Sequence, residues 1–155
     1  MCDFERPLPI ETESYDGALL INVLEHIFEY RAFLAETARI VRSGGRVVVV
    51  VPYLFPYHAS PEDYHRYSAS ALRRALALAG FVDVQVAALG TGVCAAAWQL
   101  FERLLPGPVR FVSLLAVPLT SAGDWLLLRC AQFLHKKYLP ADYALGFVVT
   151  AFKRI

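Results

Sequence analysis

The first third of the chain contains two apolar runs separated by an amphipathic segment. Ala18 to Leu24 is apolar apart from Asn22, and Val47 to Val51 is an unbroken β-branched run. Such runs are typical of parallel strands that are buried on both faces. Between them, Tyr30 to Val41 carries apolar residues at helical spacing, with charged residues mostly on the opposite side. The pattern therefore predicts a strand, a helix and a strand, which is the βαβ unit of an α/β sheet.

The second half of the chain continues with a helix and two more strands. Ser68 or Ser70 is expected to cap a helix that runs through Leu78. Phe81 to Ala87 alternates apolar and polar residues, as a strand at a sheet edge does, and Gly146 to Lys153 predicts a last strand. One domain over residues 1–155 is the natural organisation for a chain of this length.

A helical insertion is predicted over residues 94–139, between the last two strands. Ala95 to Leu105 has aromatic residues aligned on one helix face, and Ser121 to Asp124 resembles a capping box that opens a helix through Lys137. Three interpretations stay open: a helical hairpin packed on the sheet, a lid over an apolar ligand, or a helix that rests on a membrane with its basic end toward the headgroups. Charged residues and a proline interrupt every window long enough to span a membrane.

Composition narrows the classes of partner. Hydrophobic residues make up 57% of the 155 residues and the mean hydropathy is +0.44, so part of the surface needs a partner, a membrane or further chain. The net charge is +1, and no basic cluster interleaved with aromatic residues indicates a nucleic-acid partner. The three cysteines are widely spaced, which argues against disulfides or a zinc site, and the N-terminus has no signal-peptide pattern. We expect a cytoplasmic protein.

Several motifs together resemble one family, the class I S-adenosylmethionine-dependent methyltransferases of the small-molecule type. They are Asp-Gly-Ala-Leu-Leu-Ile-Asn-Val-Leu-Glu-His from Asp16, Ala-Arg-Ile-Val-Arg-Ser-Gly-Gly-Arg ending at Arg46, and Val-Pro-Tyr ending at Tyr53. The likeness continues through Pro61 to Tyr67 and on to Phe81. It covers roughly half of the chain, and the motifs occur in the family's order.

The resemblance implies an α/β fold built as a partial Rossmann-like methyltransferase sheet. Its strands are expected in the order four, five, seven, six, with strand seven antiparallel and the helical insertion before it. The family's first three strands, with the Gly-rich loop that wraps the cofactor, have no counterpart in the sequence. Gly90-Thr-Gly92 follows an edge strand and does not replace that loop. The chain therefore resembles the C-terminal half of the family's domain.

The resemblance also implies S-adenosylmethionine as cofactor. By that resemblance Asp3 approaches the adenine amino group and Phe4 borders the ring, while Asn22, Val23 and Glu25 lie at the cofactor end of the family's fourth strand. Each has a structural alternative. Asp3 can be a solvated terminal residue, Asn22 a hydrogen-bonding residue in a strand, and Glu25 the cap of the next helix.

His26 and His58 are the predicted catalytic residues. His26 ends the first predicted strand, and open α/β sheets bind ligands at the carboxyl ends of their strands. A histidine near neutral pH can take a proton from an acceptor hydroxyl, amine or acid. The alternative is that His26 packs under a loop.

A long loop after Pro52 is rich in aromatic residues, histidine and charge, and loops of this kind are usually functional. The resemblance implies that it borders the methyl-acceptor pocket. The predicted substrate-binding residues are Tyr53, Asp63, His65, Arg66 and Tyr67. An ion pair between Asp63 and Arg66 that ties the loop down is the alternative. We expect no metal site, because the spacing of His58, Asp63 and His65 matches no standard signature.

The sequence thus predicts a methyltransferase of a small-molecule or lipid-like acceptor, not competent as this chain alone. The alternative from another class is a non-catalytic interaction or membrane-peripheral module that keeps half of the fold. Peripheral membrane contact would use the insertion. A homodimer would form through the predicted strand Ala18 to Leu24, whose family neighbour is missing.

Overall fold

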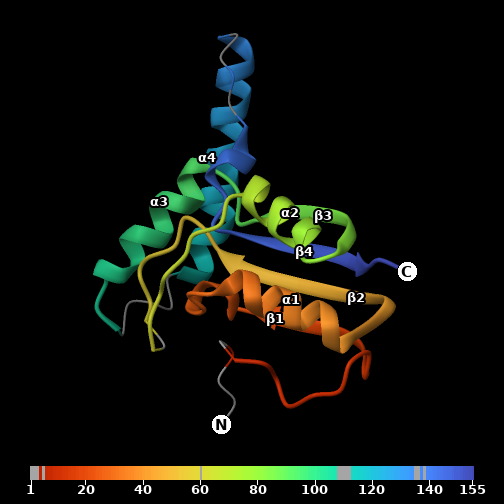
Figure 1. Cartoon of the computed structure of the whole chain (residues 1–155). Coiled ribbons are helices and arrows are strands. Elements are labelled where there is room, and N and C mark those ends of the chain that lie inside the picture. Colours follow the sequence, from red (N-terminus) through yellow and green to blue (C-terminus); the bar gives the residue numbers. More distant parts are fainter. Residues whose placement is uncertain (1–3, 5, 60, 108–112, 135–136, 138) are drawn as a thin grey trace. The chain divides into compact units, whose positions relative to one another are not determined.

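The computed structural model describes residue 4 and residues 6–59, 61–107, 113–134, 137 and 139–155 (Figure 1). They form two compact units. The first takes residues 1–53, 57–87 and 147–155, and the second takes residues 54–56 and 88–146. The second unit contains the segment for which the sequence predicts a helical insertion.

A four-stranded mixed sheet carries the fold. Its strands are β1 (Tyr15–Ile21), β2 (Val41–Pro52), β3 (Phe81–Leu89) and β4 (Gly146–Lys153), in the order β1-β2-β4-β3. β1 pairs in parallel with β2, and β4 runs opposite to β2 in Figure 1. The predicted order of the family strands four, five, seven, six is therefore confirmed, as is the Rossmann-like α/β class.

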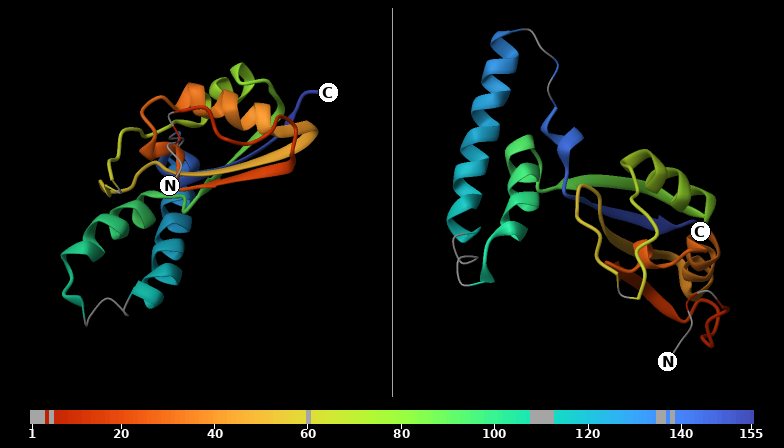
Figure 2. Two further views of the ribbon diagram at one scale, coloured as in Figure 1. Left: turned by 60° about the horizontal axis from the view of Figure 1, so that its bottom comes forward. Right: turned by 90° about the vertical axis from the view of Figure 1, so that its left-hand side faces the viewer.

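Helices α1 (Tyr30–Ile40) and α2 (Ala69–Leu78) cover one face of this sheet (Figure 2, left). Phe33 and Leu34 of α1 are buried, as are Leu72 and Leu76 of α2. Burying such side chains contributes about 1.5–3 kcal/mol each, which makes this layer the core of the unit. The Ser68 side chain accepts a hydrogen bond from Ala71 N, so the predicted cap of α2 is confirmed.

The boundaries of β1 differ from the prediction. The strand ends at Ile21 rather than at Leu24, because Asn22 adopts a left-handed conformation with φ of 51°. A short 3-10 turn, η1 (Leu24–His26), follows. Burial on both faces was also wrong for this strand, since Leu19 is 70% exposed while its neighbour Leu20 is buried.

β2 begins six residues before the predicted Val47, directly after α1. Two glycines allow this early start. Gly44 has a φ of 75°, and a Cβ on Gly45 would lie 2.8 Å from the carbonyl oxygen of Asp16. A side chain at either position would strain the backbone at the start of β2.

The second unit contains α3 (Val93–Phe101), η2 (Glu102–Leu104), α4 (Ser113–Phe133) and η4 (Pro140–Tyr143). α3 packs against α4, as Figure 2 shows, and in α3 the rings of Trp98 and Phe101 lie 5.9 Å apart. None of the helices among the described residues is long and apolar enough to cross a membrane.

The predicted capping box at Ser121 to Asp124 is wrong. α4 already begins at Ser113, so Ser121 lies inside the helix, where its hydroxyl donates to the carbonyl of Val117 at 2.8 Å. Asp124 instead caps the other helix of the unit, since its carboxylate accepts from Cys94 N at 2.9 Å and from Ala95 N at 3.1 Å. The helix also ends at Phe133 rather than at the predicted Lys137.

Candidate functional site

The turn η1 and the loop 57–67 are held together by backbone hydrogen bonds. Tyr64 N and His65 N both donate to the carbonyl oxygen of Glu25, at 2.9 and 3.3 Å. The hydroxyl of Tyr67 donates to the carbonyl of Leu24 at 3.1 Å. These bonds fix the loop over the turn that follows β1, so side chains far apart in the sequence meet here.

Three of the side chains that meet are Glu25, His26 and His58. Oε1 of Glu25 lies 3.7 Å from Nε2 of His26 and 3.6 Å from Nε2 of His58. Glu25 is fully buried, and within the described part of the chain neither of its carboxylate oxygens has a hydrogen-bond partner. Because distances of this length exceed a hydrogen bond, the buried carboxylate is left with its bonding capacity unused.

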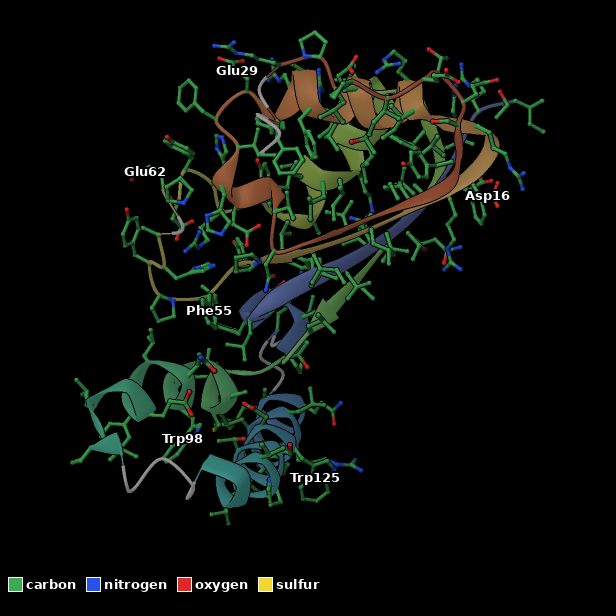
Figure 3. The ribbon with its side chains drawn as sticks, turned by 90° about the horizontal axis from the view of Figure 1, so that it is seen from below. Asp16, Glu29, Phe55, Glu62, Trp98 and Trp125 are labelled. Carbon is green, nitrogen blue, oxygen red and sulfur yellow. The ribbon has the colours of Figure 1, made fainter. Side chains whose placement is uncertain are left out.

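The Nδ1 atom of each histidine faces an oxygen atom of the loop. Nδ1 of His26 bonds the carbonyl oxygen of Glu62, the residue that Figure 3 labels on the loop. A carbonyl only accepts, so the proton of a neutral His26 ring is on Nδ1 and the lone pair of Nε2 faces Glu25. Nδ1 of His58 lies 3.4 Å from Oδ2 of Asp63. The two rings stand edge to face with their centroids 5.2 Å apart.

Asp63 and Arg66 form the ion pair that was the structural alternative. Both terminal nitrogens of the guanidinium donate to the carboxylate, which also accepts from His58 N at 3.0 Å. The hydrogen bonds from Arg66 hold the pKa of Asp63 well below its usual range, although burial of the carboxyl opposes the shift. The pair anchors the loop beside His58, and a role for either residue in binding an acceptor stays a prediction.

The rings of His65 and Tyr67 belong to an aromatic cluster with Tyr30. The ring of His65 is 5.1 Å from that of Tyr30 and 5.3 Å from that of Tyr67, and its Nε2 is 3.2 Å from the carbonyl oxygen of Phe28. Tyr67 is buried, and this desolvation raises the pKa of its phenol. The cluster attaches the loop to the start of α1.

The remaining predicted residues are placed as follows. Asn22 and Val23 come directly before η1, and Tyr53 packs on Phe147 with ring centroids 5.2 Å apart. Phe4 is 45% exposed and meets Phe33 edge to face at 5.3 Å, whereas Asp3 lies outside the described residues.

Two alternatives for the turn after β1 can be compared with the structure. Glu25 does not cap α1, because the cap residue of that helix is Glu29, which makes no side-chain capping bond. The end-of-strand assignment of His26 also changes, since the residue ends η1 instead. His26 does pack under the loop, through Glu62, but its side chain keeps 13% exposure. No sequence pattern could reveal the Glu62 contact, because it uses a backbone carbonyl.

Comparison with known proteins connects the chain to methyltransferases. Residues 1–49 match a family described as a methyltransferase domain. Two proteins of Mycobacterium tuberculosis, from strains CDC 1551 and H37Rv, are described as probable S-adenosylmethionine-dependent methyltransferases. Each is 30% identical over 91 residues, which cover 55% of this chain and 33% of the relative. The chain thus spans about a third of the length of these curated relatives.

Solved structures share the fold at low identity. Phosphoethanolamine N-methyltransferase 2 of Haemonchus contortus, in complex with S-adenosyl-L-methionine, aligns with a TM-score of 0.55 and 16% identity over 94% of this chain and 35% of that one. The [4+2]-cyclase SpnF aligns with a TM-score of 0.58 and 18% identity over 99% of this chain and 54% of that one. These likenesses establish the fold, and the chemistry has to be argued from the site.

Proposed function

We propose that this chain belongs to the class I S-adenosylmethionine-dependent methyltransferases, that it forms the acceptor-side half of such an enzyme, and that the enzyme acts on a small-molecule or lipid-like acceptor. The observation that carries the proposal is the cluster of Glu25, His26 and His58. Glu25 and His26 follow β1 and His58 follows β2, so the cluster lies beyond the carboxyl ends of two parallel strands, where α/β sheets bind their ligands.

The described residues fit the adenine side of the cofactor. Nearly half of the surface of Phe4 is exposed, and Phe33 contacts its ring edge to face. The exposed part of the ring suits stacking of a purine. The buried carboxylate of Glu25, without a hydrogen-bond partner, suits a ligand that brings donors or positive charge. S-adenosylmethionine supplies an activated methyl group when it is bound. Asn22 and Val23 precede this carboxylate and complete the residues that we assign to the cofactor.

The Gly90-Thr-Gly92 turn does not offer a second cofactor loop. It opens α3 as a Gly-rich turn would, but the amides of Cys94 and Ala95 already donate to Asp124. A Cβ on Gly92 would lie 2.1 Å from the same carboxylate, so the glycine serves this internal cap. An anionic or polar ligand group would have to displace Asp124.

His26 and His58 would handle the proton of the acceptor. Their Nδ1 atoms are turned to Glu62 and Asp63, so the Nε2 atoms are the ones turned to the site. Side-chain exposures of 13% and 29% leave both rings within reach of a bound acceptor. A neutral Nε2 can accept a proton from a hydroxyl, amine or acid as the methyl group is transferred.

Five further residues complete the proposed acceptor side. Tyr53 and the loop residues Asp63, His65, Arg66 and Tyr67 would shape the pocket, with the Asp63 and Arg66 pair holding His58 in place. Since Arg66 is already paired with Asp63, we assign it a positioning role rather than recognition of an anionic acceptor.

The proposal that the chain is one half of an enzyme has two supports. The alignment covers 33% of the length of the M. tuberculosis relatives and 35% of the length of the Haemonchus contortus methyltransferase. β1 is an edge strand of the sheet, with Leu19 and Ile21 more than half exposed, so it can pair with a further strand. The strands that carry the Gly-rich loop would come from additional polypeptide.

The test joins this chain to the N-terminal part of the M. tuberculosis relative and supplies methyl-labelled S-adenosylmethionine. Polar and lipid fractions of a metabolite extract serve as acceptors. We expect label in one fraction, and His26→Ala or His58→Ala should lower transfer by about 100-fold or more while cofactor affinity stays within about twofold.

Arg42→Ala serves as the control, since Arg42 pairs with the exposed Asp16 and lies outside the proposed site. It should transfer label at the parent rate. Unchanged transfer in both histidine variants would remove the proposed base role. Cofactor binding without transfer to either fraction would favour the non-catalytic module.

A further inference from the structure

We propose that Glu25, His26 and His58 bind a divalent transition-metal ion, for which Zn²⁺ is the best fit. The sequence led us to expect no metal, because it was judged by the spacing of His58, Asp63 and His65. The structure brings together a different set of three, in which Glu25 replaces Asp63 and His26 replaces His65.

The spacing of the ligand atoms suits a tetrahedral ion. One potential ligand atom from each of the three side chains lies within 4.8 Å of the other two, and the Nε2 atoms of His26 and His58 lie 3.7 and 3.6 Å from Oε1 of Glu25. Ligands at the usual zinc distances of about 2.0–2.2 Å stand about 3.3–3.5 Å apart in a tetrahedron. Small side-chain rotations would therefore complete the coordination.

The buried negative charge of Glu25 favours the binding of a cation. Glu25 is fully buried, and neither oxygen has a hydrogen-bond partner within the described ranges. A buried carboxylate without donors is strongly unfavourable unless a positive charge accompanies it. The charge of Arg66 does act on Glu25, but both terminal nitrogens of its guanidinium donate to Asp63, and neither carboxylate oxygen of Glu25 accepts a hydrogen bond from the described residues.

The other ring nitrogen of each histidine already faces an oxygen atom of the loop. Metal-binding histidines usually give their other ring N–H to a carbonyl or a carboxylate, which fixes the tautomer and the ring orientation. Nδ1 of His26 bonds the carbonyl of Glu62, and Nδ1 of His58 faces the carboxylate of Asp63 at 3.4 Å. The bond to Glu62 turns the Nε2 lone pair of a neutral His26 toward Glu25, and Nε2 of His58 lies 3.6 Å from the same carboxylate.

Two imidazoles and one carboxylate favour zinc and its neighbours over Mg²⁺ or Ca²⁺, which prefer oxygen ligands. Three protein ligands leave at least one coordination position open, as in catalytic zinc sites. In the metal-bound form the Nε2 atoms would be ligands, so the ion would replace the base role proposed above for His26 and His58: an acceptor oxygen at the open position would lose its proton more readily. Metal binding itself does not depend on the proposed methyl transfer, because it is measured directly.

The experiment titrates the full chain, stripped of metal with a chelator and alkylated at its cysteines, with Zn²⁺ against a chromophoric competitor. We expect one Zn²⁺ per chain with micromolar or tighter affinity, a rise in melting temperature with Zn²⁺, and no competition from millimolar Mg²⁺. Glu25→Gln, His26→Asn and His58→Asn should each weaken binding by about tenfold or more, and the double histidine variant should abolish it.

His65→Asn is the matched control. His65 comes from the same loop, but its ring packs on Tyr30 and its Nε2 lies beside the carbonyl of Phe28. Binding by this variant should stay within about twofold of the parent. The proposal fails if the parent binds no Zn²⁺, if His65→Asn weakens binding as much as His58→Asn, or if the double variant binds as tightly as the parent. Circular dichroism of each variant separates loss of the site from loss of the fold.

Discussion

Replacing Asp63 by Asn tests how the loop is held over the turn after β1. The substitution keeps the size of the side chain but removes the charge that pairs with Arg66. It also leaves a guanidinium that is 26% exposed without its anionic partner. The backbone N–H of His58 can still donate to the amide oxygen of the substituted side chain, so the loss of stability comes mainly from the ion pair.

The size of the effect follows from burial. The side chain of Asp63 is fully buried, and a hydrogen bond to a charged group contributes about 1.5–3 kcal/mol. Breaking a buried ion pair from one side costs about 3–5 kcal/mol, but Arg66 is partly exposed and water can solvate it. We therefore expect Asp63→Asn to lower the free energy of unfolding by about 2–3 kcal/mol at pH 7.

The difference between parent and variant should depend on pH. The folded state lowers the pKa of Asp63, chiefly through its hydrogen bonds with Arg66. A lowered pKa contributes stability that is complete above the unfolded value of about 3.9 and is lost as pH falls toward the folded value. The gap between parent and Asp63→Asn is therefore largest near neutral pH and shrinks below about pH 4.

Urea unfolding followed by circular dichroism measures both quantities. Asp16→Asn is the control, because it removes an ion pair with Arg42 whose side chains are 60% and 82% exposed, at the end of the sheet away from Glu62 (Figure 3). It should change the free energy of unfolding by less than about 1 kcal/mol. Equal effects of the two substitutions at pH 7, or a gap that does not close in acid, would refute the argument.

Further predictions concern the edge strand and the second unit. The exposed edge of β1 predicts dimers by sedimentation at micromolar concentration, which Leu19→Lys should dissociate; a parent that is already monomeric contradicts this. Asp124→Asn should weaken the cap of α3 by about 1 kcal/mol, seen as faster hydrogen exchange of Cys94 and Ala95; unchanged exchange would argue against the cap. If the second unit contacts lipid through the exposed apolar residues of α4, liposomes with anionic lipid should float the chain, and Trp125→Ser should reduce this; flotation equal to that of a liposome-free blank removes the proposal.

The sheet was predictable from the sequence because its strands carry strong patterns. The β-branched run at Val47 to Val51 and the last strand at Gly146 to Lys153 both appear in the sheet, and the motifs specified their order. The end of β1 was missed because it depends on the backbone of Asn22, which turns left-handed inside an apolar run. Periodicity reports side-chain environment and does not detect one residue with a positive φ.

The candidate site was predictable only in part. His26 and His58 were both named from the sequence, but nothing in their spacing placed them on the two sides of one buried carboxylate. That arrangement depends on the backbone bonds that dock the loop on η1, and these are tertiary contacts. The role of Asp124 was mispredicted for a related reason. Its spacing from Ser121 is typical of a local capping box, but in the structure its carboxylate caps the neighbouring helix α3.

The most direct test of the central claim is a calorimetric titration with S-adenosylmethionine. The chain holds residues for only one side of the cofactor in our account. Because each 1.4 kcal/mol changes affinity about tenfold, losing several kcal/mol of contacts moves micromolar binding to millimolar or weaker. We predict no measurable binding by this chain alone, and micromolar binding once it is joined to the N-terminal part of the M. tuberculosis relative. Micromolar binding by the chain alone, or none by a joined protein that is folded, would contradict the account.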